Sequence, residues 1–326
     1  GSKWGKYIRA PDIFFKILEK GKGKLVPLKE VAEVRRGFTT GANEFFYLTE
    51  NEIKKWGIER EFWMHPLKKD EDVPVPKHVW KDKNGEYFRV SQYAERMKLE
   101  DVLRDDGYVY WIPNYLIKSP RECKSILVDP KSLRYRVLLI HKDKSKLRET
   151  NVLKYIEWGE ARGFHERPTC ATRNRWYDLG DWSKKPDLLW SDAYNVRFAS
   201  FNNKYAWGDK RFFFINLKDQ TYRNILLGYL NSTIITLLIE IDGITNLGQG
   251  VVYTNVYWLK RLLVPNPTKI DSRLQSKIKD CLNKLEKRSV SSIFEEIGAD
   301  KEVSLDKVKP DRRELDKIIM GKILGL

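Results

Sequence analysis

The sequence predicts an α+β fold in which short strands, mixed or antiparallel in direction, alternate with capped helices. Three observations support this. Apolar runs at residues 188–190 and 211–215 have the length of buried strands, residues 151–163 have the pattern of a helix, and apolar residues recur at helical spacing near the carboxyl end. With 41% hydrophobic and 13% aromatic residues, the 326-residue chain can bury a core, which excludes a wholly disordered protein.

The first 50 residues are predicted to contain one short helix followed by strands and a turn. Apolar positions indicate a helix over residues 7–20, which Pro11 and Asp12 open and Gly21 and Gly23 end. Next we expect a docking segment at residues 25–28 and a strand at residues 31–37. A turn at residues 38–43 and a further strand at residues 45–48 should follow.

The rest of the chain is predicted to alternate irregular stretches with regular elements. Residues 50–110 mix aromatic and charged residues with Pro and Gly, which indicates loops and short strands. Besides the elements already named, we expect a buried strand at residues 137–140 and a helix at residues 222–242, ended by Gly243. The helical repeats near the carboxyl end are Leu274, Ile278, Leu282 and Leu285, then Leu315, Ile318, Ile319 and Ile323, and Asp311 with Glu314 fits a capping box.

The charge of the chain points to a polyanionic partner. The chain contains 61 Lys and Arg residues against 45 Asp and Glu, a formal net charge of +16, so nucleic acid is the first candidate. Residues 225–241 are the most apolar stretch, but polar residues such as Asn231 and Glu240 interrupt it. This stretch therefore predicts a buried helix, and we expect no membrane partner.

The cysteines and the amino terminus predict a cytoplasmic protein. Cys123, Cys170 and Cys281 lie far apart and leave one thiol unpaired in any disulfide scheme, which suits a reducing compartment. Gly1 and Ser2 look like an expression scar, and no apolar leader follows them.

Motifs for cofactor, metal or nuclease chemistry are weak. The glycine clusters follow predicted helices and do not join a strand to a helix, and no Walker motif occurs. The four histidines lack the spacing of zinc ligands. A nuclease would have to use acids such as Asp12 with Glu52, or Asp129 beside Lys131, and such spacings arise by chance in so charged a chain. We therefore expect no cofactor and no metal here, with a metal-dependent nuclease as an open alternative.

The first candidate DNA-binding segment covers residues 35–43. Arg35 and Arg36 end a predicted strand, and Thr39, Thr40 and Asn43 follow on a glycine-containing loop. Arg can donate two hydrogen bonds to guanine and Asn can pair with adenine, whereas Thr hydroxyls suit phosphates. A surface hairpin with solvated arginines explains the same pattern equally well.

The second candidate segment combines arginines with aromatic residues. Arg167, Arg173 and Arg175 lie near Trp176 and Tyr177, and guanidinium and aromatic groups can engage phosphates and unstacked bases. The alternative is that the two aromatic residues anchor the core. The basic stretch at residues 131–148, including Lys142 and Lys144, would supply unspecific phosphate contacts or a solvated face.

Several segments together resemble the target recognition region of N6-adenine DNA methyltransferases of the TaqI and Eco57I type. They are residues 24–48, which contain Arg-Arg-Gly-Phe-Thr-Thr-Gly-Ala-Asn, and residues 155–177, 211–219, 227–232 and 312–326. The resemblance implies a TaqI C-terminal-like α+β domain that binds double-stranded DNA in a restriction-modification system. It also implies an upstream methyltransferase domain in the same polypeptide, which would bind S-adenosylmethionine.

One departure from that family concerns catalysis. Its full-length members carry an Asn-Pro-Pro-aromatic loop, but this chain contains no Pro-Pro dipeptide, and Asn266-Pro267-Thr268 cannot replace the loop. We therefore expect these residues to be inactive alone, with no S-adenosylmethionine site, and the parent to be an adenine-specific DNA methyltransferase.

The expected organisation has three parts: residues 1–2 as a scar, residues 3–265 as a loop-rich recognition domain that could form two lobes, and residues 266–326 as a helical segment. Two further alternatives stay open. One is the specificity subunit of a type I restriction system, against which the absence of an internal repeat argues. The other is a basic module that docks on an acidic protein.

Overall fold

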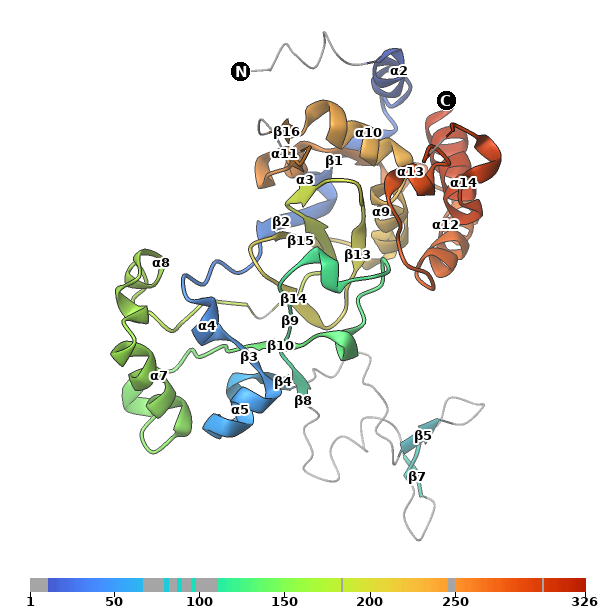
Figure 1. The fold of residues 1–326 in the computed structure, drawn as a ribbon. Helices are drawn as coiled ribbons and strands as arrows, with labels where there is room; N and C mark the ends of the chain where they lie inside the picture. The colour runs from blue at the N-terminus through green and yellow to red at the C-terminus, as the bar shows by residue number, and fades with distance from the viewer. Residues whose placement is uncertain are drawn as a thin grey trace. The chain divides into compact units, whose positions relative to one another are not determined.

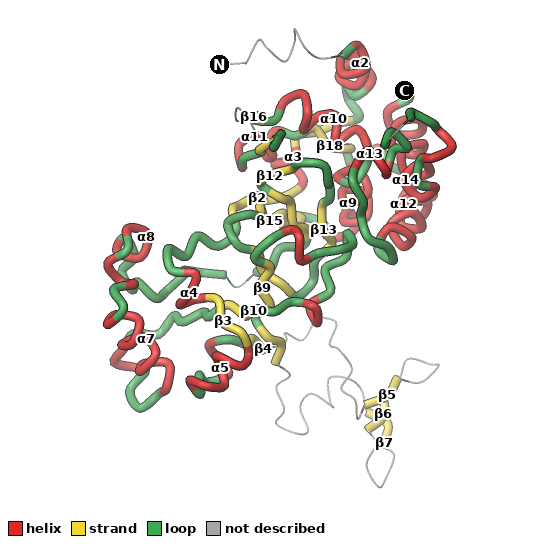
Figure 2. The backbone as a smooth tube through the Cα atoms, viewed as in Figure 1, coloured by secondary structure: helices red, strands yellow, loops and turns green. Residues whose placement is uncertain are grey.

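The computed structural model describes residues 11–66, 79–81, 87–89, 95–97, 111–182, 184–245, 250–300 and 302–326 (Figure 1). Helices and mainly antiparallel strands alternate along the chain, as Figure 2 shows, which confirms the predicted α+β class. The chain forms two compact units. Unit 1 comprises Gly1–Thr40, Tyr115–Tyr135 and Asp181–Leu326, and unit 2 comprises Gly41–Asn114 and Arg136–Gly180. The predicted helical segment 266–326 thus lies within unit 1.

The centre of unit 1 is a four-stranded antiparallel sheet. Its strand order is β13 (Ser200–Asn202), β11 (Leu188–Ser191), β15 (Phe212–Leu217) and β2 (Ala32–Arg36). Every residue of β15 is buried, which explains its unbroken apolar run, Phe-Phe-Phe-Ile-Asn-Leu, apart from one Asn. The outer strand β2 alternates instead: Ala32 and Val34 are buried, and Arg35 lies on the exposed face. This alternation places Arg35 at the edge of a rigid sheet.

Shorter strand pairs complete unit 1. They are the antiparallel pair β1 (Leu25–Pro27) and β18 (Leu263–Pro265), the parallel pair β9 (Tyr115–Ile117) and β14 (Ala206–Gly208), and the three strands β12 (Ala193–Tyr194), β17 (Val252–Tyr253) and β16 (Ile244–Thr245). The β1–β18 pair joins two segments that lie far apart in the sequence, on either side of unit 2.

The helices of unit 1 gather mostly after the sheet strands in sequence. They are α2 (Asp12–Lys20), α3 (Leu28–Val31), α9 (Arg223–Leu230), α10 (Thr233–Asp242), α11 (Val256–Arg261), α12 (Ser272–Leu285), α13 (Ile293–Glu296), α14 (Pro310–Asp316) and a π-helix at Lys317–Leu324. The 3₁₀ helices are Pro120–Glu122, Pro130–Ser132, Gln220–Tyr222, Pro267–Lys269 and Leu305–Lys307. Gly228 lets α9 approach α12 closely, because a Cβ atom there would lie 2.6 Å from the Ile278 side chain.

The single helix predicted over residues 222–242 is wrong, because two helices occupy this stretch. They are separated at Asn231, whose side chain bonds to both the backbone N–H and the carbonyl of Ser200 on β13. Sheet contacts therefore fix the break. Among the described residues, no single helix has the length and apolarity to cross a membrane. The bent pair Gln220–Leu230 and Thr233–Asp242 would pass on length and composition, with a 68° bend between its halves.

A buried ionic network joins the last helices of unit 1. Arg288 donates to both carboxylate oxygens of Glu296, at 2.6 and 2.7 Å, and to both of Asp311, at 2.6 and 2.9 Å. Arg312 adds a 3.0 Å bond to Glu296. The predicted capping box at Asp311 and Glu314 is wrong, because α14 begins at Pro310 and Asp311 faces Arg288 instead.

Unit 2 is built from short elements around an aromatic core. Its elements are α4 (Asn43–Phe46), β3 (Tyr47–Thr49), α5 (Glu50–Trp56), β4 (Met64–Pro66), β5 (Val79–Lys81), β6 (Tyr87–Arg89), β7 (Glu95–Met97), β8 (Trp111–Pro113), α7 (Asn151–Ala161), α8 (Pro168–Ala171) and the 3₁₀ helices Arg60–Phe62, Lys144–Lys146 and Phe164–Glu166; β10 (Tyr135–Val137) begins at its boundary. β4 pairs with β8, and β5, β6 and β7 form an antiparallel sheet.

Two predictions for unit 2 need correction. The strand expected at residues 45–48 starts as the helix α4, and the strand begins only at Tyr47. The helix α5 lies in a region expected to hold loops and short strands. Its start is a capping box in which Thr49 accepts from the Glu52 N–H and the Glu52 carboxylate accepts from the Thr49 N–H. The helix predicted over residues 151–163 is confirmed as α7.

Candidate nucleic-acid interface

Arg35, a predicted DNA-binding residue of unit 1, lies against an aromatic ring and two backbone carbonyls. Its guanidinium carbon lies 4.0 Å from the centre of the Trp182 ring, and its two Nη atoms donate to the carbonyls of Asp181 (3.4 Å) and Lys184 (3.5 Å). Partial burial lowers the pKa of Arg35, and the charges of Asp181 and Glu33 oppose that effect, so the group stays cationic. The strand and the indole ring together fix where this cation lies.

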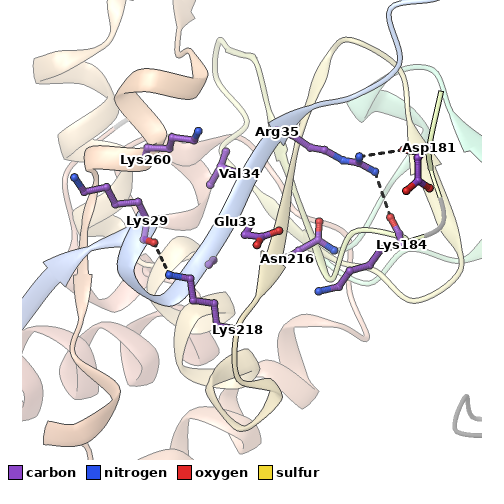
Figure 3. Close-up of a pocket in the computed structure, with 10 residues that line it drawn as sticks. Lys29, Glu33, Val34, Arg35, Asp181, Lys184, Asn216, Lys218 and Lys260 are labelled. Carbon is purple, nitrogen blue, oxygen red and sulfur yellow. Dashed lines mark hydrogen bonds between the residues drawn. The ribbon is translucent and has the colours of Figure 1, made fainter. Parts of the chain in front are cut away.

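A pocket of about 630 Å³ lies along β2, and we call it the cationic pocket. Its lining residues are Lys29, Ala32, Glu33, Val34, Arg35, Asp181, Lys184, Asn216, Lys218 and Lys260. Figure 3 shows Lys29, Lys218 and Lys260 toward one end of the pocket, and Lys184 with the Arg35 hydrogen bonds toward the other. Five cations against two carboxylates give this pocket an excess of positive charge, which suits an anionic ligand.

Three lysines of the cationic pocket are available to a ligand. In the part of the chain that the structure describes, the ammonium groups of Lys29, Lys184 and Lys260 have no hydrogen-bond or ion-pair partner. Lys218 donates to the carbonyl of Lys29 at 3.0 Å. Unpaired exposed ammonium groups bind phosphate without first giving up a carboxylate.

The fold assembles this pocket from segments that lie far apart in sequence. Lys29 lies on α3, Lys184 precedes β11, Lys218 follows β15 and Lys260 lies on α11. Antiparallel pairing of β2 with β15 and of β1 with β18 brings these segments together. Of this set, only Arg35 could be predicted from the sequence, because single lysines in four segments give no local motif.

The other predicted residues around β2 differ in their surroundings. Arg36 donates to the Lys210 carbonyl at 3.1 Å and lies 3.7 Å from an oxygen of Asp192. Thr39 is exposed, whereas Thr40 is buried. Asn43 starts α4 in unit 2 and is half-buried.

The two glycines of the predicted DNA-reading loop serve internal packing. A Cβ atom on Gly37 would lie 2.4 Å from the Asp209 carbonyl oxygen in unit 1. Gly41 has φ +78° and would place a Cβ atom 2.7 Å from the Thr169 side chain in unit 2. Close approach to the protein's own backbone and side chains therefore explains both glycines without DNA.

The predicted cations of unit 2 are already paired with groups of the same unit. Lys142 binds Glu61 (2.6 Å), Lys144 binds Glu160 (2.6 Å), Arg167 binds Glu44 (3.0 Å), Arg175 binds Asp143 (2.7 Å) and Asp178 (2.6 Å), and Arg173 donates to the Trp176 carbonyl (3.1 Å). A phosphate would have to compete with these acids, so this surface offers less free positive charge than the sequence suggests.

Trp176 lies in the aromatic core of unit 2. Its ring is 4.5 Å from that of Phe45, and Phe45 stacks on Tyr155 at 4.7 Å. The Trp176 Nε1 donates to Glu160 at 2.9 Å. Tyr177 is also buried. These positions agree with the alternative interpretation, in which both aromatic residues anchor the core.

The described ranges contain no cluster of side chains suited to metal or thiol chemistry. Among those residues, no group of three or more His, Cys, Asp or Glu side chains is arranged to hold a metal ion. Asp129 caps the 3₁₀ helix Pro130–Ser132 by accepting from the Lys131 N–H at 3.0 Å. Two of the acids considered for a nuclease, Glu52 and Asp129, therefore have capping roles.

Comparisons with known proteins identify a matching family and similar solved structures. The model of the type II methyltransferase M.Eco57I C-terminal domain matches residues 126–299, more than half of the chain. No curated protein matches. Two similar solved structures are those of the type IIG restriction endonuclease BpuSI and of the type IIL restriction-modification enzyme MmeI in complex with DNA.

The likeness to these two enzymes is one of fold. BpuSI gives a TM-score of 0.52 at 10% identity over 98% of this chain, and MmeI gives 0.51 at 12% over 92%. The chain spans about a third of each enzyme, 33% in both cases. The match over residues 126–299 shows that the chain belongs to the family of the type II methyltransferase M.Eco57I C-terminal domain.

Proposed function

We propose that this chain is the target recognition part of an N6-adenine DNA methyltransferase in a restriction-modification system, and that it binds double-stranded DNA. Membership of the M.Eco57I C-terminal domain family supports the proposal, as does the net charge of +16. The observation that carries it is the cationic pocket, with its three unpaired lysines beside β2.

The residues of the pocket suit two different tasks on a duplex. Lys29, Lys184 and Lys260 would neutralise phosphates and fix the position of the DNA. Arg35 has five N–H donors, and two hydrogen bonds to carbonyls leave others for a base edge or a phosphate. The chain would thus bind and orient the duplex. We assign S-adenosylmethionine and the extruded adenine to a methyltransferase domain of the same polypeptide.

Replacing Lys29, Lys184 and Lys260 together with alanine should weaken binding equally on all duplex sequences. Each phosphate contact contributes about 0.9 to the slope of log affinity against log salt, so the slope should fall by about 3 units. Fluorescence anisotropy with a labelled duplex, titrated from about 50 to 200 mM salt, measures this change.

Lys279→Ala provides the matched control, because Lys279 is an exposed lysine on α12 outside the pocket. It should leave the slope unchanged. A triple variant with the slope of the unsubstituted chain would remove the pocket from the interface. If the chain bound no duplex at low salt, the proposed function would be wrong, and a basic module for an acidic protein would replace it.

Arg35→Ala should reduce discrimination between DNA sequences. If Arg35 donates to a base edge, the preferred duplex should lose about 1–3 kcal/mol of binding free energy and other duplexes much less. Enrichment from a random duplex library first identifies the preferred sequence. Equal losses on preferred and other duplexes would make Arg35 a phosphate contact.

A further inference from the structure

An exposed tyrosine lies next to the cationic pocket. Tyr257 on α11 is 69% exposed, more than any other aromatic side chain in the described part of the chain. Its hydroxyl oxygen accepts a hydrogen bond from Arg261 Nη1 at 2.9 Å, and the Arg261 guanidinium carbon lies 5.0 Å from the ring centre. Arg261 therefore holds the exposed ring in place, which lowers the entropy that the ring would lose on binding.

The packing of α11 does not depend on Tyr257. Leu259 is fully buried, and Trp258 lies 5.9 Å from the ring of Trp190 while its Nε1 donates to Asp242 at 3.2 Å. These two side chains attach the helix to unit 1. The core therefore does not use the Tyr257 ring, which leaves it available to a ligand.

The same helix supplies cations beside the ring. Lys260 and Arg261 follow Tyr257 at positions i+3 and i+4, so the three side chains project from neighbouring positions on α11. Lys260 lines the cationic pocket, and α11 contains no acidic residue. The Leu28 N–H, at the start of α3, donates a 2.8 Å hydrogen bond to the carbonyl of Leu262, the residue after α11. This bond keeps Lys29 of α3 and the helix α11 on the same surface.

We propose that Tyr257 packs its ring against a base or deoxyribose of the duplex, while Arg261 and Lys260 contact the flanking phosphates. Aromatic rings favour the flat apolar parts of a nucleotide, and the cations beside this ring match the charge of the backbone. The proposal rests on the proposed function and adds a specific aromatic contact to it. α11 becomes a second part of the DNA surface, continuous with the cationic pocket.

Tyr257→Ala should lower duplex affinity by about tenfold and leave the salt slope unchanged, because it removes an uncharged contact. Arg261→Ala should instead reduce the slope by about one unit. Phe294→Ala is the matched control, since Phe294 is an exposed aromatic residue on α13 that does not line the cationic pocket. It should change neither quantity. Thermal unfolding verifies that all three variants keep the fold.

Photo-crosslinking tests the contact directly. Duplexes that carry 5-iododeoxyuridine at successive positions are irradiated with the unsubstituted chain, and mass spectrometry should locate a crosslink at Tyr257. If duplex binding depends on the pocket lysines but Tyr257→Ala binds normally and no crosslink maps to α11, this inference is wrong and the proposed function stands. If no duplex binds at all, both are wrong.

Discussion

Glu296→Ala is expected to lower the free energy of unfolding by about 3–5 kcal/mol, because it leaves the buried Arg312 and the half-buried Arg288 without their shared carboxylate. Glu296 is 1% exposed and accepts from Arg288 and Arg312. Asp311 also binds Arg288, but in the described residues no other carboxylate accepts a hydrogen bond from the Arg312 guanidinium. Urea unfolding followed by circular dichroism measures the loss. Glu295→Ala, at the exposed neighbouring position, should change stability little.

The same network makes stability depend on pH in acid. Burial acts to raise the pKa of Glu296, but hydrogen bonds from Arg288 and the charge of Arg312 lower it to about 2, from an ordinary value of 4.5. Because the folded-state pKa is depressed, this contribution is complete above pH 4.5 and is lost as pH falls toward 2. Glu296→Gln should lose less stability than the unsubstituted chain over this window. Parallel pH profiles for the two proteins would contradict the assignment.

Trp190→Ala should also destabilise unit 1 by about 3–5 kcal/mol, because it empties the volume of a large core side chain. Trp190 is fully buried on β11, its Nε1 donates to the Thr254 hydroxyl at 2.9 Å, and its ring contacts Trp258 of α11. Since Trp258 attaches α11, we expect duplex binding to weaken as well. Thermal unfolding and the anisotropy titration measure the two effects.

Trp190→Phe separates packing from hydrogen bonding. It retains an aromatic ring between the sheet and α11 and removes the donor to Thr254, so its loss of stability should be smaller than that of the alanine variant. If the Phe and Ala variants were equally unstable, the hydrogen bond rather than the packing would dominate at this position.

Elements with a strong local signal could be predicted from the sequence. The strands at residues 188–190 and 211–215 and the helix over residues 151–163 are confirmed, because unbroken apolar runs and helical periodicity specify them locally. The start of α5 also had a local signal, the Thr49 and Glu52 capping pair, which the prediction of loops overlooked. The break between α9 and α10 could not be predicted, because Asn231 takes its partner from β13.

The candidate site was less predictable for an electrostatic reason. The sequence shows how many cations a segment contains, but not which acid lies beside each of them. Lys142 is paired with Glu61, and Arg167 with Glu44, across long stretches of chain. Lys29 and Lys260 show the opposite case, in which isolated lysines become neighbours of one pocket only after the strands pair.

The pairing of β1 with β18 also has a consequence for biosynthesis. Leu25–Pro27 is translated before all of unit 2, and its partner Leu263–Pro265 is translated only after unit 2. At about 5–20 residues per second, β1 waits for tens of seconds with its backbone groups unpaired. Translation of the segment between them, which includes all of unit 2, is complete before unit 1 can close. Stalling of translation between β1 and β18 should therefore yield nascent chains that depend on chaperones.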